Sequence, residues 1–153
     1  MLKKIGIGFA LIGALSAPAR ALDDGTQLMA GGLTFGESAI TAWTSPGFPG
    51  AVTNDFPGPN KGERAVQLRM PAGVLKGLKV KLITESVPTS GTFSVMVRKN
   101  SVDTVLTCQV NGQGNCNGTA NVNFLENDRL AIRVINALVG SGDMIATYTV
   151  QFD

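Results

Sequence analysis

The sequence predicts an all-β fold, a two-sheet antiparallel β-sandwich of jelly-roll topology. From Leu78 onward, apolar residues recur at every second position, which is the period of a strand with one buried face. Turn-forming residues interrupt this alternation about every ten residues, as expected for short antiparallel strands. Eight or nine such strands in one small domain are best accommodated by two Greek keys wrapped into a jelly roll.

The first 21 residues have the composition of a secretory signal peptide. Lys3 and Lys4 precede an apolar run from Ile5 to Ala17, and a small-x-small cleavage site ends at Ala21. The apolar run is shorter than the roughly 20 residues of a transmembrane helix. We therefore expect cleavage after residue 21 and a secreted or periplasmic protein without a membrane span, in which residues 22–153 form a single β-sandwich domain.

The N-terminal half is expected to contain three strands and one long loop. The strands are predicted at residues 28–35, 38–44 and 65–70. The loop runs from Ser45 to Arg64 and carries four prolines and four glycines, which excludes a central strand because proline has no ladder donor. No helix longer than a turn is predicted anywhere in the mature chain.

Six strands are expected in the last 76 residues. Their inward rows are Leu78, Val80 and Leu82; Phe93, Val95 and Val97; Val102 to Val110 at alternate positions; Val122 and Phe124; Leu130, Ile132 and Val134; and Met144 to Phe152 at alternate positions. The polar triplets at residues 99–101 and 126–128 are predicted to be tight turns, since Asn and Asp tolerate turn conformations. Lys76, Lys79 and Lys81 are predicted on the solvent-facing side of their strand.

Cys108 and Cys116 are the only cysteines, and we expect them to form a disulfide. An even cysteine pair in an exported protein is most simply a structural bridge. The seven residues between them include Asn111 and Gly112, so the bridge is predicted to close a hairpin end. A redox-active pair would favour a Cys-x-x-Cys spacing, which is absent.

The composition argues against catalysis and against nucleic acid as a partner. The chain has no histidine, the usual general base and zinc ligand. Without its signal peptide it carries ten basic and eleven acidic residues, which gives no net attraction for nucleic acid or anionic lipid. We expect a non-enzymatic protein with no cofactor and no metal site.

Two groups of aromatic residues are the candidate interaction sites. Trp43, Phe48 and Phe56 lie in or beside the proline-rich loop, where they either contact a partner or fold back to plug an open end of the sandwich. Tyr148 and Phe152 share one face of the last strand, where they belong either to the core or to an oligomer interface.

Part of the sequence resembles a known family. The segment from Gly91 to Cys108 resembles the central hairpin of secreted bacterial proteins similar to the tumour-necrosis-factor and complement globular-head jelly rolls. Residues 122–134, with the turn Glu126-Asn127-Asp128, resemble the next hairpin of that superfamily. The resemblance covers roughly residues 78–152. It implies a jelly roll that assembles as a trimer and binds partners without catalysing a reaction.

Two functions follow from these observations. The first is an exported structural, adhesive or partner-binding module that self-associates as a trimer. The second is a monomeric carbohydrate-binding sandwich in which Trp43, Phe48 and Phe56 stack on sugar rings. The partner is accordingly a second copy of the chain, a protein ligand or a glycan.

We predict that the mature domain is a homotrimer. Besides the resemblance, Met96, Val105 and Ile135 are apolar residues placed opposite the inward rows of their strands. Stable obligate interfaces bury about 2,000 Å² or more and would cover such residues. Light scattering at micromolar concentration should give three times the mass of one chain, and a single monomeric species would contradict the prediction.

Overall fold

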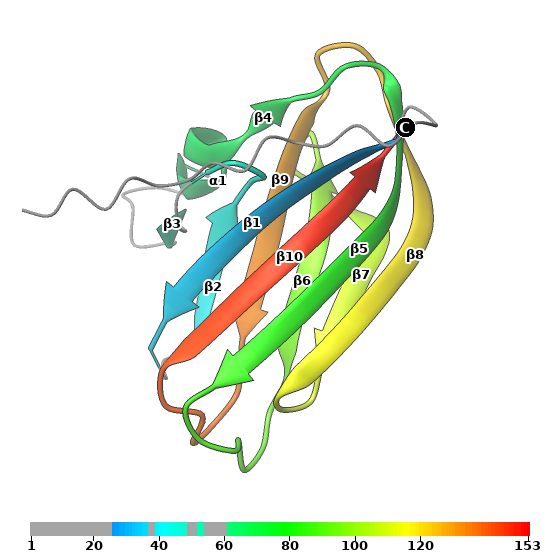
Figure 1. The fold of residues 1–153 in the computed structure, drawn as a ribbon. Helices are drawn as coiled ribbons and strands as arrows, with labels where there is room; N and C mark the ends of the chain where they lie inside the picture. The colour runs from blue at the N-terminus through cyan, green and yellow to red at the C-terminus, as the bar shows by residue number, and fades with distance from the viewer. Residues whose placement is uncertain (1–25, 37–38, 49–51, 54–60) are drawn as a thin grey trace, which may run out of the picture.

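The computed structural model describes residues 26–36, 39–48, 52–53 and 61–153 and contains two antiparallel sheets packed face to face (Figure 1). The first sheet has the order β1-β10-β5-β8. Its strands are β1 (Gln27–Phe35), β10 (Met144–Phe152), β5 (Gly73–Thr84) and β8 (Gly114–Phe124). All three pairings between them are antiparallel.

The second sheet has the order β3-β2-β9-β6-β7. Its strands are β3 (Val52–Thr53), β2 (Ile40–Thr44), β9 (Arg129–Asn136), β6 (Phe93–Lys99) and β7 (Val102–Val110). A short strand, β4 (Leu68–Arg69), also pairs with β9, next to its start.

The strand order confirms the predicted jelly-roll sandwich. With β3 and β4 set aside, the described residues form eight strands of five residues or more. We number these strands one to eight along the chain. Across one sheet their order is 1-8-3-6, and across the other it is 2-7-4-5. Successive strands therefore lie in opposite sheets except β6 and β7, which form a hairpin within one sheet, and this is the strand order of a jelly roll.

The core lies between the sheets and is built by the predicted inward rows, except at the start of β7, where Val102 is exposed and Thr104 is only partly buried. Every second residue of β10, from Met144 to Phe152, is buried, as are Leu78, Val80 and Leu82 of β5. Phe124 and Phe152 close one end of the core with an edge-to-face contact, their ring centroids 6.5 Å apart. All six predicted C-terminal strands are present.

The segment between β2 and β5 differs from the prediction. Helix α1 (Lys61–Val66) occupies the end of the predicted loop, and the predicted strand 65–70 is reduced to β4. The helix carries Glu63 in its first turn and Arg64 in its last, which complements the helix dipole. It buries Glu63 and Val66, three residues apart on one face, against the second sheet.

The Cys108–Cys116 disulfide is present, with the two Cα atoms 5.7 Å apart, but it does not close a hairpin. Cys108 lies on β7 and Cys116 on β8, which are edge strands of different sheets. The disulfide therefore joins the two sheets. Next to it, a Cβ atom on Gly118 would lie 2.3 Å from the carbonyl oxygen of Thr107, so only glycine permits this close approach.

Hydrogen bonds and an ion pair of Asp128 join the β6–β7 turn to the β8–β9 turn at one end of the sandwich. Asp128 accepts hydrogen bonds from the Asn100 side chain at 2.6 Å and from the Leu125 amide at 2.7 Å, and it pairs with Lys99 at 2.8 Å. Lys99 contributes most, followed by Leu125 and Asn100, to lowering the pKa of Asp128 to about 2. This carboxylate thus connects the β6–β7 turn to the β8–β9 turn.

The predicted signal peptide, residues 1–21, lies outside the described residues, and its cleavage remains a prediction. In the part of the chain that the structure describes, no helix is long and apolar enough to cross a membrane.

Reducing the disulfide should destabilise the domain by about 2.5 kcal/mol, the loop-entropy value for a bridge between residues eight apart. Urea denaturation of the oxidised and reduced protein measures this difference. Because the bridge joins two sheets, reduction should also speed amide hydrogen exchange in both β7 and β8. Two free thiols in the unreduced protein, detected by mass spectrometry, would contradict the assignment.

Asp128→Asn should lower stability at neutral pH, and the deficit should shrink in acid. The folded-state pKa of Asp128 is about 2, below the ordinary value of 3.8. Its stabilising contribution is therefore complete above pH 4 and is lost as the pH falls towards 2. Urea midpoints of wild type and variant should converge over this interval. An equal difference at pH 7 and pH 2 would refute this role.

Candidate functional site

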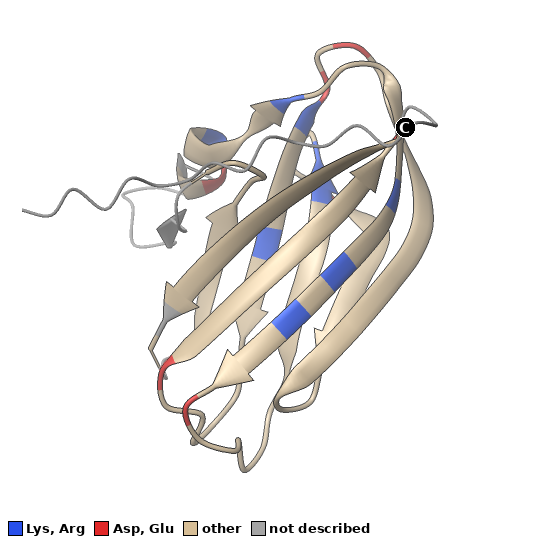
Figure 2. Cartoon of the chain, viewed as in Figure 1, with Lys and Arg blue, Asp and Glu red and all other residues tan. Residues whose placement is uncertain are grey.

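The outer face of the β1-β10-β5-β8 sheet holds the candidate site. In β5 the buried residues Leu78, Val80 and Leu82 alternate with exposed ones, so Lys79 and Lys81 point away from the core. Figure 2 shows these basic positions as blue bands along β5, in the middle of the sheet.

Strand register places polar side chains on both sides of each lysine. Lys79 is paired with Thr149 of β10 and Asn117 of β8. Lys81 is paired with Thr147 and Asn115 in the same way. The six residues of these two rows line a shallow groove with a volume of about 290 Å³, which we call the lysine groove.

The groove has an uncompensated positive charge. None of the four strands contains an aspartate or glutamate, and Figure 2 shows no acidic position on their ribbons. Lys76, the third lysine of β5, is paired with Asp153. Lys79 and Lys81 form no ion pair with any described residue. Such a surface attracts anions in a manner that salt weakens.

Two exposed aliphatic side chains border the groove. Ile83 and Ile145 are register partners in the next outward row, and they are 49% and 50% exposed. On the β1 side the groove residues are followed by Ala30 and Gly32, which are the partners of Thr149 and Thr147. The groove is therefore open towards β1 and bounded by aliphatic side chains beyond Lys81.

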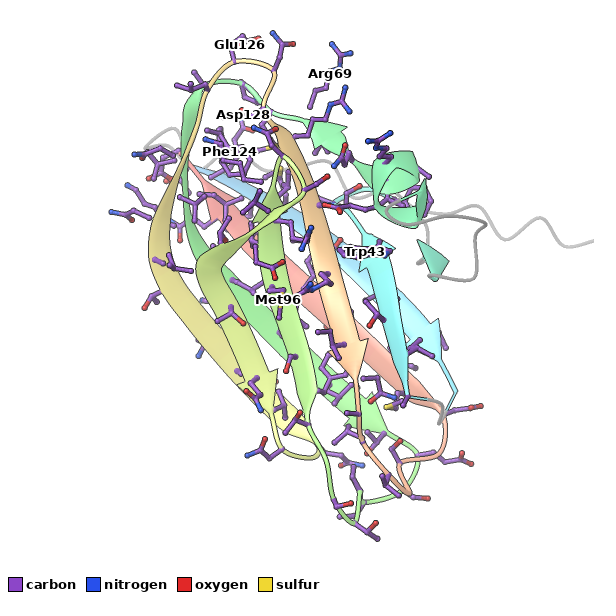
Figure 3. The ribbon with its side chains drawn as sticks, turned by 180° about the vertical axis from the view of Figure 1, so that it is seen from behind. Trp43, Arg69, Met96, Phe124, Glu126 and Asp128 are labelled. Carbon is purple, nitrogen blue, oxygen red and sulfur yellow. A yellow bond between two sulfur atoms is a disulfide. The ribbon has the colours of Figure 1, made fainter. Side chains whose placement is uncertain are left out.

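Trp43 lies on the outer face of the other sheet and is only 4% exposed (Figure 3). The guanidinium carbons of Arg98 and Arg133 lie 4.9 and 5.9 Å from the centre of its ring. Arg98 is held in turn by Glu63 of α1 at 3.0 Å and by Asp103. In this arrangement the Trp43 ring is covered by arginines and is not presented to a sugar.

Of the other two predicted loop aromatics, the structure describes only Phe48. Phe48 is half-buried in the turn after β2, where its amide donates to the Ser45 carbonyl at 3.0 Å. Phe56 lies outside the described residues. The structure therefore does not bring the three aromatic residues together into a described surface, and their partner-binding role remains a prediction.

Tyr148 and Phe152 are part of the core, which is the alternative the sequence had left open. Burial raises the pKa of Tyr148 to about 12, against a smaller lowering effect of the nearby Thr44 side chain. Its ring packs over Gly31, where an added Cβ would lie 2.3 Å from the phenol oxygen. The phenol is thus held inside the sandwich as a neutral group, and a role for the two residues in an oligomer interface stays a prediction.

The solved structures to which this chain is distantly similar include a tumour necrosis factor and a carbohydrate-binding module. No family model matches the sequence, and no curated protein matches it. The structure of the Eiger tumour necrosis factor from S. frugiperda matches with a TM-score of 0.39 and 13% identity, over 82% of this chain and 92% of that one. The carbohydrate-binding module CBM36, solved with calcium and xylotriose, matches with a TM-score of 0.38 and 11% identity, over 78% and 98%.

At these scores the two similarities carry no functional argument. The tumour-necrosis-factor resemblance predicted from residues 78–152 thus has a distant structural counterpart but no sequence family. The fold class rests on the strand order described above, and the site rests on its own geometry.

Sequence reasoning placed Lys79 and Lys81 correctly on the solvent side but assigned them no function. It missed Thr147, Thr149, Asn115 and Asn117, because only strand register brings these residues together. One signal was available, namely that β5 contains three lysines while none of the four strands of this sheet contains an acidic residue.

Proposed function

We propose that this protein is an exported, non-catalytic jelly-roll module that binds an extended acidic carbohydrate along the outer face of the β1-β10-β5-β8 sheet. The observation that carries the proposal is the pair of unpaired lysines, Lys79 and Lys81, set between threonine and asparagine side chains on a sheet without carboxylates. The disulfide supports export, because such bridges persist in oxidising compartments.

The spacing of the two lysines favours a polymeric anion over a compact one as the ligand. Residues two apart on a strand are separated by about 6.8 Å, so Lys79 and Lys81 present two cations in line along β5. The groove is shallow and open at the β1 side, with the small residues Ala30 and Gly32 there. A polymer with an acidic group on successive units can contact both lysines while its ends continue past the groove.

The neighbouring side chains favour carbohydrate over nucleic acid. Threonine hydroxyls and asparagine amides each donate and accept hydrogen bonds, which matches the hydroxyl groups of a sugar. The outward rows of this sheet contain no aromatic residue among the described positions, so they offer no stacking platform for bases. The aliphatic Ile83 and Ile145 supply a contact for the apolar face of a sugar ring.

Self-association as a trimer is the second candidate function. The edge strand β7 exposes Val102 and Val105, at 66% and 77%, which favours burial of this edge by another chain. The edge strand β7 belongs to the other sheet, so a trimer formed there would leave the lysine groove open. Three grooves in one particle would strengthen binding to a polymer through multivalency.

Lys79→Gln combined with Lys81→Gln should weaken binding to polygalacturonate about tenfold, the effect of losing two exposed charge contacts of up to about 1 kcal/mol each. Wild-type binding should also weaken as sodium chloride is added, and neutral dextran should not bind. Surface plasmon resonance on the immobilised polymers measures all three effects.

The matched control is Lys76→Gln, which removes the same charge from the same strand outside the groove. It should bind polygalacturonate as wild type does. If the control weakens binding as much as the double variant, the attraction is a general charge effect. If the double variant binds unchanged, the lysine groove is not the site.

A further inference from the structure

A second polar groove lies on the other sheet, between helix α1 and the β6–β7 turn. Its lining residues are Arg64, Gln67, Asn100, Ser101 and Arg129, and its volume is about 310 Å³. They come from α1, the residue after it, the β6–β7 turn and the first position of β9. This groove shares no residue with the lysine groove.

Hydrogen bonds hold one of its two arginines in place. Gln67 accepts a bond from an Arg129 guanidinium nitrogen at 3.3 Å and donates to the Ser101 hydroxyl at 2.9 Å. The backbone amide of Arg129 donates to the Asn100 side chain at 2.8 Å. These hydrogen bonds therefore join three segments that line the groove and are distant in sequence: Gln67, the β6–β7 turn and the start of β9.

The backbone of the turn contributes to this arrangement. Asn100 and Ser101 have φ values of 50° and 67°, the left-handed conformation of a two-residue hairpin turn. Asparagine tolerates this conformation better than most residues. The turn thereby directs both residues towards the groove, where an amide and a hydroxyl can bond a ligand.

Three carboxylates of this region already have cationic partners, and a fourth, Glu126, accepts a hydrogen bond from the Ala72 amide at 3.4 Å. Glu63 and Asp103 bind Arg98, Asp103 also binds Arg133, and Asp128 binds Lys99. Arg64, Arg129 and its register partner Arg69 have no ion pair with a described residue. Figure 3 shows Arg69 and Asp128 at this end of the molecule. Two arginines thus line one groove, and neither forms an ion pair with a described residue.

We propose that this groove binds a compact tetrahedral oxyanion, a sulfate or phosphate group, between Arg64 and Arg129. A guanidinium group presents paired N–H donors in a plane that matches two oxygens of such an anion. Gln67, Asn100 and Ser101 would meet the remaining oxygens. The proposal is independent of the carbohydrate function, because it uses other residues on the other sheet.

Isothermal titration calorimetry of the intact mature protein with sodium sulfate and with sodium phosphate, each at the ionic strength of a sodium chloride reference, tests the site. One anion per chain should bind. Arg129→Gln and Arg64→Gln should each weaken binding at least about tenfold, as expected for the loss of a charge-assisted contact. Circular dichroism of the variants establishes that they are folded.

Arg69→Gln is the matched control, since Arg69 is the ladder partner of Arg129 but does not line the groove. It should bind within about twofold of wild type, well short of the tenfold loss that marks a groove contact. Selective binding of sulfate points to a sulfated ligand, and selective binding of phosphate points to a phosphorylated one. Absence of binding by either anion, or equal loss in Arg69→Gln, would overturn the proposal.

Discussion

The alternation of side chains along β5 and β10 is the constraint on which both the core and the proposed binding face depend. Side chains on a strand point alternately to its two faces. Because Leu78, Val80 and Leu82 point into the core, Lys79 and Lys81 point into solvent. A slip of one residue would exchange the two faces, bury both lysines and expose the core row. The hydrophobic effect that stabilises the sandwich therefore also fixes the position of the lysine groove.

The second sheet is organised around a different interaction, the ion pair between Arg98 and Glu63. Glu63 is fully buried on α1, and Arg98 lies on β6, so the pair attaches the β2–β5 connection to the sheet. Removing one member of such a pair leaves a buried charge without its partner, which is more costly than the pair itself is stabilising. The same arginine covers Trp43, which explains why the outer face of this sheet offers no aromatic surface there.

The sequence was sufficient to predict strands wherever apolar residues alternate, as in Phe93 to Val97 and Met144 to Phe152. It was insufficient for the first half of β8, where Gly114 to Ala120 is polar or small and lacks an apolar row. The disulfide pairing was predictable, but its role in joining two sheets depends on strand order and not on the spacing of the cysteines. For the same reason the lysine groove, which combines β5, β8 and β10, could not be located from the sequence.

The central claim, that an acidic carbohydrate binds across β10, β5 and β8, is tested most directly by amide chemical-shift mapping. Isotope-labelled mature protein would be titrated with a defined oligogalacturonate at low salt. The largest shifts should lie at the six groove residues, namely Lys79, Lys81, Asn115, Asn117, Thr147 and Thr149. Shifts confined to the turn containing Phe48, or no shifts on this sheet, would contradict the account.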